Sequence, residues 1–456
     1  MAEDAQSVEG NEEEMAEMSV WDASVDSLKF PKLVHLREIL SDKAKSDPHY
    51  HFHNLYGHLL REDVLECAYL KVRANLGGPG VDGMTFEEIE HTVGWDAYLK
   101  GLRDELRAKT YRPSPVKRRY VKKANGKMRP LGIPTIKDRT VQAALLLVLE
   151  PIFEADFHDC SYGFRSGRCA QQAVERIQED VKAGSRQVYD ADLSSYFDTI
   201  PHDKLILALR TRVVDRSVLL LIQRFLTVCV REPDGRMVKP KGRGTPQGGV
   251  ISPLLSNVYL HFFEVMVMRE AKVAEQPVTI VRYADDFVLL APYFREGFLA
   301  KVEGFLEGRM GLTINRDKTK VLDMRRRDSV LTFLGYEFRN VWDIHFHTNR
   351  RYLAVWPSKK SVKGVCAKVK QWTQSRMGRL PIPEIIKRVN RVLSGWAAYF
   401  RVGHPYRAFG KVNWYTIRRL WKFLHRRSQR GFRWDKAKGT FTDALVSLGL
   451  RLITSP

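Results

Sequence analysis

Residues 279–291 read TIVRYADDFVLLA, and in this stretch two adjacent aspartates, Asp285 and Asp286, separate two apolar runs. Apolar, β-branched runs on either side of a short polar break predict a β-hairpin with buried arms. An Asp-Asp pair in a turn is often only turn chemistry. Between buried arms, however, the two carboxylates would repel each other by several kcal/mol unless a cation or a proton intervened. A hard divalent cation such as Mg²⁺, which prefers carboxylate oxygens, is the better interpretation.

A third acid comes from an earlier predicted strand, residues 186–193, RQVYDADL. Asp192 at its end could meet the hairpin across a sheet. Asp190 shares a strand face with Asp192 because successive side chains alternate, so spacing alone does not choose between them. Three carboxylates that bridge two metal ions are the arrangement with which phosphoryl transfer activates the attacking hydroxyl and stabilises the leaving pyrophosphate.

The overall charge points to a polyanionic partner. The 456 residues contain 75 Lys and Arg against 53 Asp and Glu, a formal net charge of +22. Nucleic acid is the first candidate and an anionic membrane the second. No apolar run approaches the roughly 18 residues of a membrane span, and no secretory pattern opens the chain, so we expect an intracellular protein without a membrane partner. The five cysteines include no C-x-x-C pair, which argues against a disulfide framework and a cysteine zinc site.

The charge is unevenly distributed along the chain. The amino-terminal stretch is acidic and lacks apolar periodicity, so a disordered leader is expected. From Arg350 to Arg433 the only acid is Glu384, while Lys, Arg and Trp recur throughout. A run of Lys and Arg is often just a solvated face, but one with almost no compensating acid favours a polyanion-binding module.

Strands and helices interleave between these two ends. The predicted elements are a hairpin that turns at Asn125-Gly126, a helix from Asp138 that stops near Pro151, a helix capped by Ser252 with Pro253 in its first turn, and one short strand at residues 332–338, TFLGYEF. The elements lack a regular βαβ rhythm. The pattern therefore favours an α+β domain built on an antiparallel sheet.

Five sequence blocks occur in the order of the fingers and palm motifs of reverse transcriptases: NGKMRPLGIPTIKDRTVQ, DLSSYFDTIPH, RGTPQGGVISPLLSNVYLHFFE, YADD and FLGYEF. Two further blocks narrow the resemblance. NLGGPGVDGMTFEEIE resembles the amino-terminal extension block of the group II and non-LTR enzymes, and VNRVLSGWAAYFRVG resembles the maturase thumb, or domain X. Over about residues 50–430 the chain resembles a group II intron-encoded reverse transcriptase/maturase.

The resemblance implies a right-hand polymerase fold of the α+β class, in which fingers and palm, an antiparallel sheet packed on helices, precede a helical thumb. The expected domains are an acidic leader (1–30), the amino-terminal extension block (31–110), fingers and palm (111–345), the basic thumb or maturase domain (346–435) and a short C-terminal tail (436–456). Neither cysteine pairs nor clustered histidines follow the thumb. We therefore expect no HNH endonuclease domain.

The resemblance also implies roles for individual residues. Asp192, Asp285 and Asp286 would be the catalytic ligands of two Mg²⁺ ions. Phe197 matches the aromatic gate that leaves no room for a 2′-hydroxyl and so selects dNTPs over rNTPs, although a core aromatic is the alternative. Further nucleotide contacts are expected from Lys123, Arg129, Gln247 and Lys318.

These four residues would contact different parts of the nucleotide. Lys123 and Arg129, on the two arms of the predicted Asn-Gly hairpin, align with residues that grip the triphosphate. Gln247 would lie against the incoming nucleotide and the template. Lys318 would neutralise or protonate pyrophosphate, although Lys320 is close by and a solvated lysine is the alternative.

In the thumb, residues 382–400 have helical spacing. The pattern turns four side chains toward a core, those of Ile385, Val389, Val392 and Trp396. It leaves Lys387, Arg388 and Arg391 for nucleic-acid phosphates.

We therefore predict a Mg²⁺-dependent RNA-directed DNA polymerase that copies an RNA template from a DNA primer with dNTPs. It is expected to bind group II intron RNA and target DNA, and so to assist splicing and mobility. The alternatives are an RNA-binding splicing maturase with incidental polymerase activity, and a host-adopted relative in DNA repair or phage defence. The expected location is the bacterial cytoplasm, at the nucleoid when the protein acts on DNA.

Overall fold

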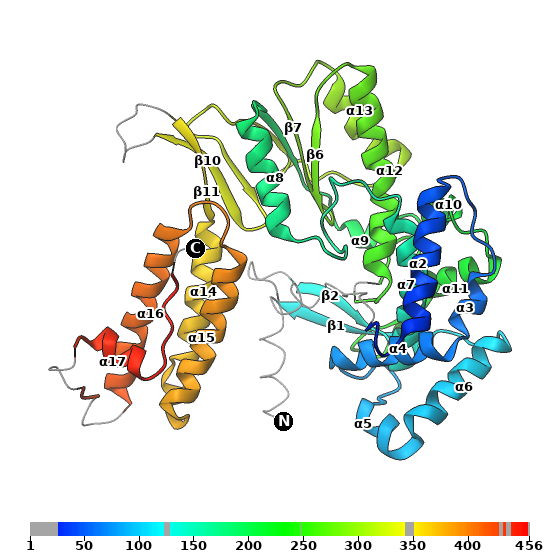
Figure 1. Ribbon diagram of the computed structural model, residues 1–456, viewed down its shortest axis with the longest axis horizontal. Helices are drawn as coiled ribbons and strands as arrows, with labels where there is room; N and C mark the ends of the chain where they lie inside the picture. The colour runs from blue at the N-terminus through cyan, green and yellow to red at the C-terminus, as the bar shows by residue number, and fades with distance from the viewer. Residues whose placement is uncertain are drawn as a thin grey trace. The chain divides into compact units, whose positions relative to one another are not determined.

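The computed structural model describes residues 26–122, 128–246, 248–342, 351–427, 432–434 and 439–454 (Figure 1). Most of the predicted acidic leader, residues 1–25, lies outside the described residues. The chain forms two compact units. The first contains Met1–Arg168, Ala191–Phe287 and Phe294–Thr319, and the second contains Cys169–Asp190, Val288–Tyr293 and Lys320–Pro456. The five consecutive domains stay a prediction, since the units interleave along the chain.

A buried helix, α7 (Ile136–Glu154), is the centre of the helical part of the first unit. Apolar residues cover all sides of this helix, which is why it is buried along almost its whole length. The helices that pack against it include α2 (Pro31–Ser46), α3 (Leu55–Leu59) and α4 (Glu62–Ala74).

The end of α7 differs from the prediction. The helix does not stop near Pro151 but continues to Glu154. A proline inside a helix lacks the N–H that would bond to the carbonyl four residues earlier, here that of Leu147. Arg37 of α2 donates from Nη1 to this Leu147 oxygen at 2.6 Å and from Nη2 to Glu150 Oε2 at 2.6 Å. The last turn persists because a neighbouring helix satisfies the carbonyl that proline leaves unpaired.

A small sheet in the first unit carries the arms of the predicted Asn125-Gly126 hairpin. Its strands are, in spatial order, β2 (Met128–Ile133), β1 (Val116–Lys122), β4 (Val230–Arg231) and β5 (Met237–Val238). β1 and β2 pair antiparallel, with Lys117 opposite Ile133 at one end and Lys122 opposite Met128 at the other. The turn itself and Lys123 lie outside the described residues.

The hairpin predicted at residues 279–291 is confirmed. Only Ala284 and Asp285 separate β6 (Thr279–Tyr283) from β7 (Asp286–Ala291), and Ala284 has φ of 57°. Two-residue turns with positive φ match the natural twist of a hairpin. Together with β3 (Gln187–Ala191) and β8 (Lys320–Asp323), these strands form a four-stranded sheet in the order β6-β7-β3-β8.

A long helix, α12 (Ser252–Val273), packs on this hairpin, with the rings of Phe263 and Phe287 4.7 Å apart. Pro253 lies in its first turn, as predicted. The prediction that Ser252 caps the helix is wrong, because Ile251 occupies the cap position. The Ser252 hydroxyl instead donates to the Pro246 carbonyl at 2.9 Å and so holds the preceding loop.

The segment predicted as one strand at residues 332–338 is a second tight hairpin. β9 (Val330–Phe333) and β10 (Tyr336–Trp342) are joined by Leu334 and Gly335, which have φ of 48° and 78°. The single-strand prediction failed because the apolar run hides a turn that needs positive φ at both central positions. β11 (Arg351–Pro357) pairs with the other side of β10 and completes a three-stranded sheet.

The second unit ends in a helical bundle. Figure 1 shows three long helices side by side, α14 (Lys359–Trp372), α15 (Ile382–Tyr399) and α16 (Tyr406–Arg426). Of the residues predicted to face a core, Ile385 and Val389 are fully buried, whereas Val392 and Trp396 are only partly buried. The helical spacing of these four residues places them on one face of α15, the face that packs on the core.

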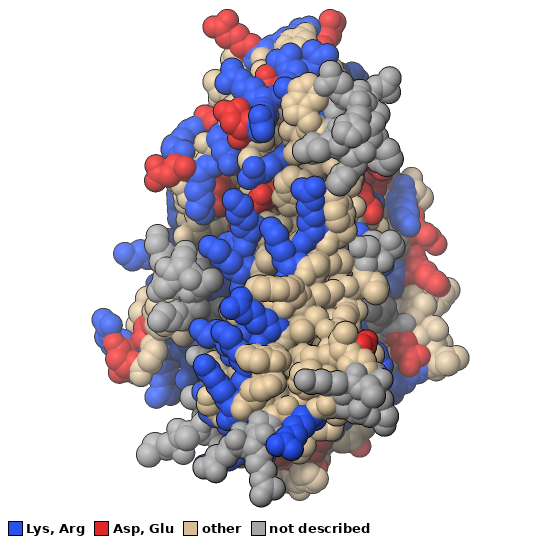
Figure 2. Space-filling view, turned by 90° about the vertical axis from the view of Figure 1, so that its left-hand side faces the viewer, with Lys and Arg blue, Asp and Glu red and all other residues tan. Residues whose placement is uncertain are grey.

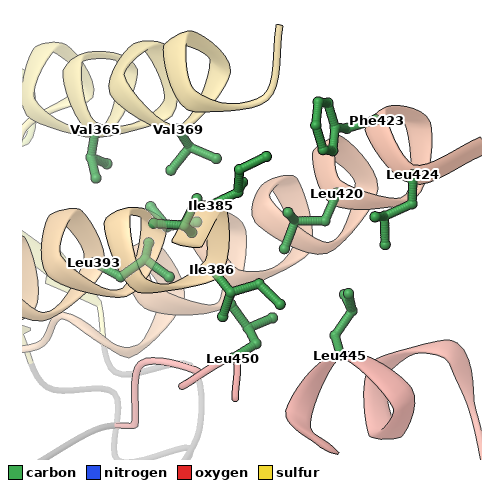
Figure 3. Close-up of a cluster of buried hydrophobic side chains, with 12 residues drawn as sticks. Val365, Val369, Ile385, Ile386, Leu393, Leu420, Phe423, Leu424, Leu445 and Leu450 are labelled. Atoms are coloured by element: carbon green, nitrogen blue, oxygen red, sulfur yellow. The ribbon is translucent and has the colours of Figure 1, made fainter. Parts of the chain in front are cut away.

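The predicted C-terminal tail belongs to the same core. Leu445, on the short helix α17 (Phe441–Ser447), and Leu450 are both buried in the cluster of the bundle. Figure 3 shows Leu450 beside Ile386 of α15. Asn390 of α15 also holds the backbone after α17, since its side chain donates to the Gly449 carbonyl at 2.8 Å and accepts from Arg451 N–H at 2.9 Å.

Candidate active site

The sheet brings the predicted aspartates to neighbouring strand ends. Asp192 directly follows β3, Asp285 is the second turn residue, and Asp286 begins β7, which is the neighbour of β3. Burial raises the pKa of the Asp285 carboxyl, and the nearby charge of Asp192 raises it further. The guanidinium groups of Arg129 and Arg282 act in the opposite direction. The charges of Asp192 and Asp285 therefore act on each other.

Asp190, the alternative to Asp192, has a different environment. It lies opposite Lys320 in the antiparallel pairing of β3 with β8, and Lys320 Nζ is 3.8 Å from Asp190 Oδ2. Lys320, on the edge strand β8, thus supplies a cation that pairs with Asp190.

The loop that precedes β8 surrounds Asp192. Lys318 donates from Nζ to both carboxylate oxygens of Asp192 at 3.0 Å, and Asn315 Nδ2 donates to Oδ2 at 3.0 Å. The Asn315 N–H also donates to the Asp192 carbonyl at 2.8 Å. Lys318 was predicted to approach the pyrophosphate, and it lies beside a predicted metal ligand. Asn315 was not predicted, because nothing in the sequence pairs it with Asp192.

A buried arginine supports the turn that carries Asp285. Arg282 of β6 is fully buried and donates to Glu264 Oε1 at 2.5 Å and to Ser161 Oγ at 2.6 Å. Its Nη1 donates to Asn257 Oδ1 and to the Ala284 carbonyl, both at 2.9 Å. Arg282 thus fixes the first turn residue directly. The sequence analysis missed this role, although a charge in the middle of an apolar strand was the available signal.

Close backbone packing holds the same turn from another side. A Cβ added to Gly163 would lie 2.3 Å from Ala284 N, so only glycine fits there. Asn257 Nδ2 donates to the Gly163 carbonyl at 2.9 Å. The turn is therefore held by the segment around Gly163 as well as by Arg282.

Phe197 lies five residues after Asp192 on the short helix α9 (Tyr196–Thr199). Its ring is half-buried and makes edge contacts with Phe164 and Tyr196, with centroids 6.4 and 5.4 Å apart. Its carbonyl accepts from Thr245 N–H at 2.7 Å. This arrangement leaves part of the ring accessible, as a gate against a ribose hydroxyl requires.

The structure describes only some of the other residues that are predicted to contact the nucleotide. Lys123 and Gln247 lie outside the described residues. Arg129 is exposed on β2, and its charge acts on Asp285. Gly248 has φ of 102°, and an added Cβ would lie 2.3 Å from the Gly132 carbonyl, so this loop presses against β2. Bulk is therefore excluded at position 248, next to Gln247.

The donor chemistry of the aspartates fits a hard divalent cation, since carboxylate oxygens are the preferred ligands of Mg²⁺. The charge of Asp192 raises the pKa of Asp285, and the Lys318 ammonium pairs with Asp192. Both effects indicate that the site around these carboxylates favours a cation. Within the described residues, however, no three Asp, Glu, His or Cys side chains gather at metal-binding spacing.

Lys and Arg side chains gather on one face of the molecule, with few acidic side chains among them (Figure 2). Lys387 and Arg391 of α15 are exposed and line a cavity of about 390 Å³ beside the backbone of residues 448–451. Arg388 is engaged otherwise, since its Nε donates to Glu384 Oε1 at 2.8 Å and its guanidinium lies 4.5 Å from the ring centre of Trp372. Lys387 and Arg391 are therefore better placed than Arg388 to contact phosphates.

Two family descriptions match the sequence. "Reverse transcriptase (RNA-dependent DNA polymerase)" matches residues 121–338, and "Group II intron, maturase-specific domain" matches residues 362–440. Protein YkfC of Escherichia coli (strain K12) is 37% identical over 281 residues, which cover 53% of this chain and 72% of that protein. Group II intron-encoded protein LtrA of Lactococcus lactis subsp. cremoris is 36% identical over 226 residues, which cover 48% of this chain and 36% of LtrA.

A third relative extends over more of the chain. The uncharacterized 91 kDa protein in the cob intron of Schizosaccharomyces pombe is 26% identical over 460 residues, covering 83% of this chain and 54% of that protein.

These matches identify the protein as a reverse transcriptase, an RNA-directed DNA polymerase with the α+β right-hand fold that the sequence predicts. The chain belongs to the family of group II intron-encoded reverse transcriptases and maturases. Enzymes of the reverse transcriptase family generally depend on a divalent metal. None of the helices in the described parts of the chain is long and apolar enough to cross a membrane.

Proposed function

We propose that Asp192, Asp285 and Asp286 hold two Mg²⁺ ions with which this reverse transcriptase extends a DNA primer on an RNA template. The proposal rests on one observation above all: Asp192 follows strand β3, and Asp285 and Asp286 lie at the start of the neighbouring strand β7, in a turn that Arg282 supports. When bound, the two ions would activate the attacking hydroxyl and stabilise the leaving pyrophosphate. The chain spans only about a third of LtrA, so the partners of the whole protein are part of this proposal.

Other residues of the chain would bind and orient the nucleotide. Phe197 would contact the sugar and exclude a 2′-hydroxyl. Arg129 and Lys318 would oppose the negative charge of the triphosphate, since both already act electrostatically on the aspartates. Lys123 and Gln247 are assigned to the same nucleotide by resemblance alone.

Primer extension tests this assignment. An RNA template annealed to a DNA primer is incubated with Mg²⁺ and dNTPs, and the wild type is compared with Asp285→Ala. We expect extension by the wild type and none by the variant. Asp190→Asn is the matched control, because it removes a carboxylate on the same strand face and should leave extension intact. If Asp190→Asn abolished extension and Asp192→Asn did not, the choice of Asp192 would be wrong.

We further propose that the second unit binds structured group II intron RNA, and that the protein assists splicing and mobility at a DNA target. The maturase-specific match at residues 362–440 and the exposed Lys387 and Arg391 support this function. Binding should weaken steeply with salt, because phosphate contacts release counterions. With RNA and DNA as substrates, we infer that the protein works in the bacterial cytoplasm, at the nucleoid when it acts on DNA.

A splicing maturase with incidental polymerase activity is the second candidate, favoured by the same maturase-specific match. A splicing assay with the double variant Asp285→Asn, Asp286→Asn separates the two. Splicing at the wild-type rate without polymerisation would favour the maturase as the principal function. A host-adopted role in DNA repair or phage defence would share this active site, so the test is whether intron RNA flanks the reading frame.

A further inference from the structure

Two segments of the first unit that are distant in the sequence are joined by a short ladder of hydrogen bonds. Residues 197–202 contain Phe197 on α9 and lead into α10 (His202–Arg210). Residues 242–245 end two positions before Gln247. We call the two joined segments the clasp. Its backbone hydrogen bonds run from Thr245 N–H to the Phe197 carbonyl at 2.7 Å, from Gly244 N–H to the Ile200 carbonyl at 2.9 Å, and from His202 N–H to the Gly242 carbonyl at 3.0 Å.

Neither segment of the clasp has much stability of its own. The helix α9 has only four residues, and so short a helix does not persist in isolation. Residues 242–249, GRGTPQGG, include four glycines, which lose more conformational freedom than other residues when a loop is fixed. Each segment therefore depends on the hydrogen bonds that join it to the other. The position of the Phe197 ring consequently depends on this loop.

One side chain, that of His202, adds a further bond to the clasp. Its Nε2 lies 2.7 Å from the Gly244 carbonyl oxygen. A carbonyl only accepts, so Nε2 carries the hydrogen and donates it. The ring is buried, and its Nδ1 has no hydrogen-bond partner among the residues that the structure describes. Since an unmet buried polar atom is costly, stability alone would favour an apolar side chain at this position. The bond to Gly244 is therefore the property that distinguishes histidine here.

Close packing couples the same loop to the residue that follows Phe197. Gly244 has φ of 90°, and a Cβ added to it would lie 3.0 Å from the carbonyl oxygen and 3.2 Å from the Cα of Asp198. The loop backbone thus rests directly on α9, with no side chain between them to absorb a shift. A displacement of Gly244 is therefore transmitted to the backbone that carries the Phe197 ring.

We propose that His202 is a positioning residue for sugar selection: its bond to the Gly244 carbonyl keeps the clasp together, so that the Phe197 ring stays where a 2′-hydroxyl would collide with it. The proposal rests on the proposed role of Phe197 as the gate. His202 is buried and acts through the loop, without touching the nucleotide. When its bond is lost, the loop and α9 separate more easily and the ring gives way to a ribose. A dNTP lacks the colliding hydroxyl, so its incorporation changes less.

The test is competition between rNTPs and dNTPs on one primer, with the full-length chain. The ratio of the two incorporations does not depend on the amount of active enzyme, so a variant that is merely less stable keeps the wild-type ratio. His202→Phe keeps a buried ring but removes the donor, and it should raise rNTP incorporation relative to dNTP incorporation by roughly 3- to 10-fold. His202→Gln carries an amide N–H that can replace Nε2–H, and it should stay within about twofold of the wild type.

A pair of glycine variants tests the clasp without changing His202. Gly244→Ala places a methyl group against Asp198 and should raise the same ratio. Gly235→Ala is the matched control, because Gly235 has φ of 88° and open space around an added Cβ. It introduces the same backbone strain without a contact and should leave the ratio unchanged. Gly244→Ala carries the test if His202→Phe does not fold.

Phe197→Val in the same assay separates this inference from the gate assignment. If Phe197→Val raises the ratio while His202→Phe and Gly244→Ala leave it unchanged, the role of His202 is overturned and the gate stands. An unchanged ratio in all three variants overturns the gate assignment together with the inference. Equal rises in His202→Gln and His202→Phe, or in Gly235→Ala and Gly244→Ala, would also overturn the inference, because neither the bond nor the contact would then be the cause.

Discussion

Lys318 donates hydrogen bonds to both carboxylate oxygens of Asp192, each at 3.0 Å. Lys320, two residues later on β8, instead has its Nζ 3.8 Å from Oδ2 of Asp190 on β3. The two lysines are two residues apart, yet they serve different carboxylates. Of the two lysines, Lys318 is thus the one that contacts a proposed metal ligand.

The two lysines give a matched pair of variants. Lys318→Ala should lower kcat of primer extension by roughly 100-fold, because a cation that stabilises the departing charge is lost, with a smaller change in the KM for dNTPs. Lys320→Ala should stay within about twofold of the wild type, since it removes only a partly exposed ion pair. Equal losses in the two variants would contradict the assignment. Steady-state kinetics over a range of dNTP concentrations separates kcat from KM.

Phe197 should determine the choice of sugar. Phe197→Val removes the ring that would face a 2′-hydroxyl, so rNTP incorporation relative to dNTP incorporation should rise by about tenfold or more. Phe197→Tyr keeps the bulk and should keep the discrimination. Competition between rNTPs and dNTPs on one primer measures the ratio, and an unchanged ratio in Phe197→Val would mean that the ring is only a packing residue.

Arg282 should be essential for the fold around the catalytic turn. Arg282→Met leaves the fully buried Glu264 without its arginine partner, and breaking such a buried pair costs about 3–5 kcal/mol. Urea unfolding should therefore begin at a clearly lower concentration. Arg269→Met, at an exposed position of α12, is the control and should shift the midpoint little. Replacing both partners, Arg282→Met with Glu264→Leu, should recover part of the loss, and failure to do so would indicate that the bond to Ala284 dominates.

The same pair predicts a pH dependence of stability. Burial raises the pKa of Glu264, but Arg282 and His261 outweigh this effect, so that the pKa lies below its ordinary value of 4.5. A carboxyl whose pKa is lowered by folding contributes stability above pH 4.5 and loses it as the pH falls further. Glu264→Gln should therefore be destabilised most at neutral pH, and its difference from the wild type should shrink below about pH 4.5. Urea midpoints at several pH values test this, and a difference that is constant with pH would contradict it.

Leu450 should stabilise the helical bundle of the second unit. Its side chain is 3% exposed within the bundle core, so Leu450→Ala should cost about 2–5 kcal/mol. Val446→Ala, at a position that is 50% exposed, should cost little and serves as the control. Limited proteolysis of the C-terminal region reports the loss directly. Equal protease resistance in the two variants would mean that the last residues contribute little to the core.

Much of the fold could be predicted because its signals are local. The hairpin at residues 279–291 follows from two apolar runs around a two-residue break, and the inward faces of Ile385 and Val389 follow from helical spacing. The turn at Leu334-Gly335 was missed for the same reason, since an unbroken apolar run reads as one strand. Pro151 misled the helix prediction because its effect depended on Arg37, which lies far away in the chain.

By itself, the sequence determined the family, the α+β class, the position of the aspartate-bearing turn and the basic character of the last helices. These properties depend on residue order and on neighbours a few positions apart. Only the tertiary structure decided that Arg282 supports Ala284, that Lys318 reaches Asp192, and that Leu450 completes a core. Such contacts join residues distant in the chain, and a side chain's local sequence does not encode which distant partner the fold will bring beside it.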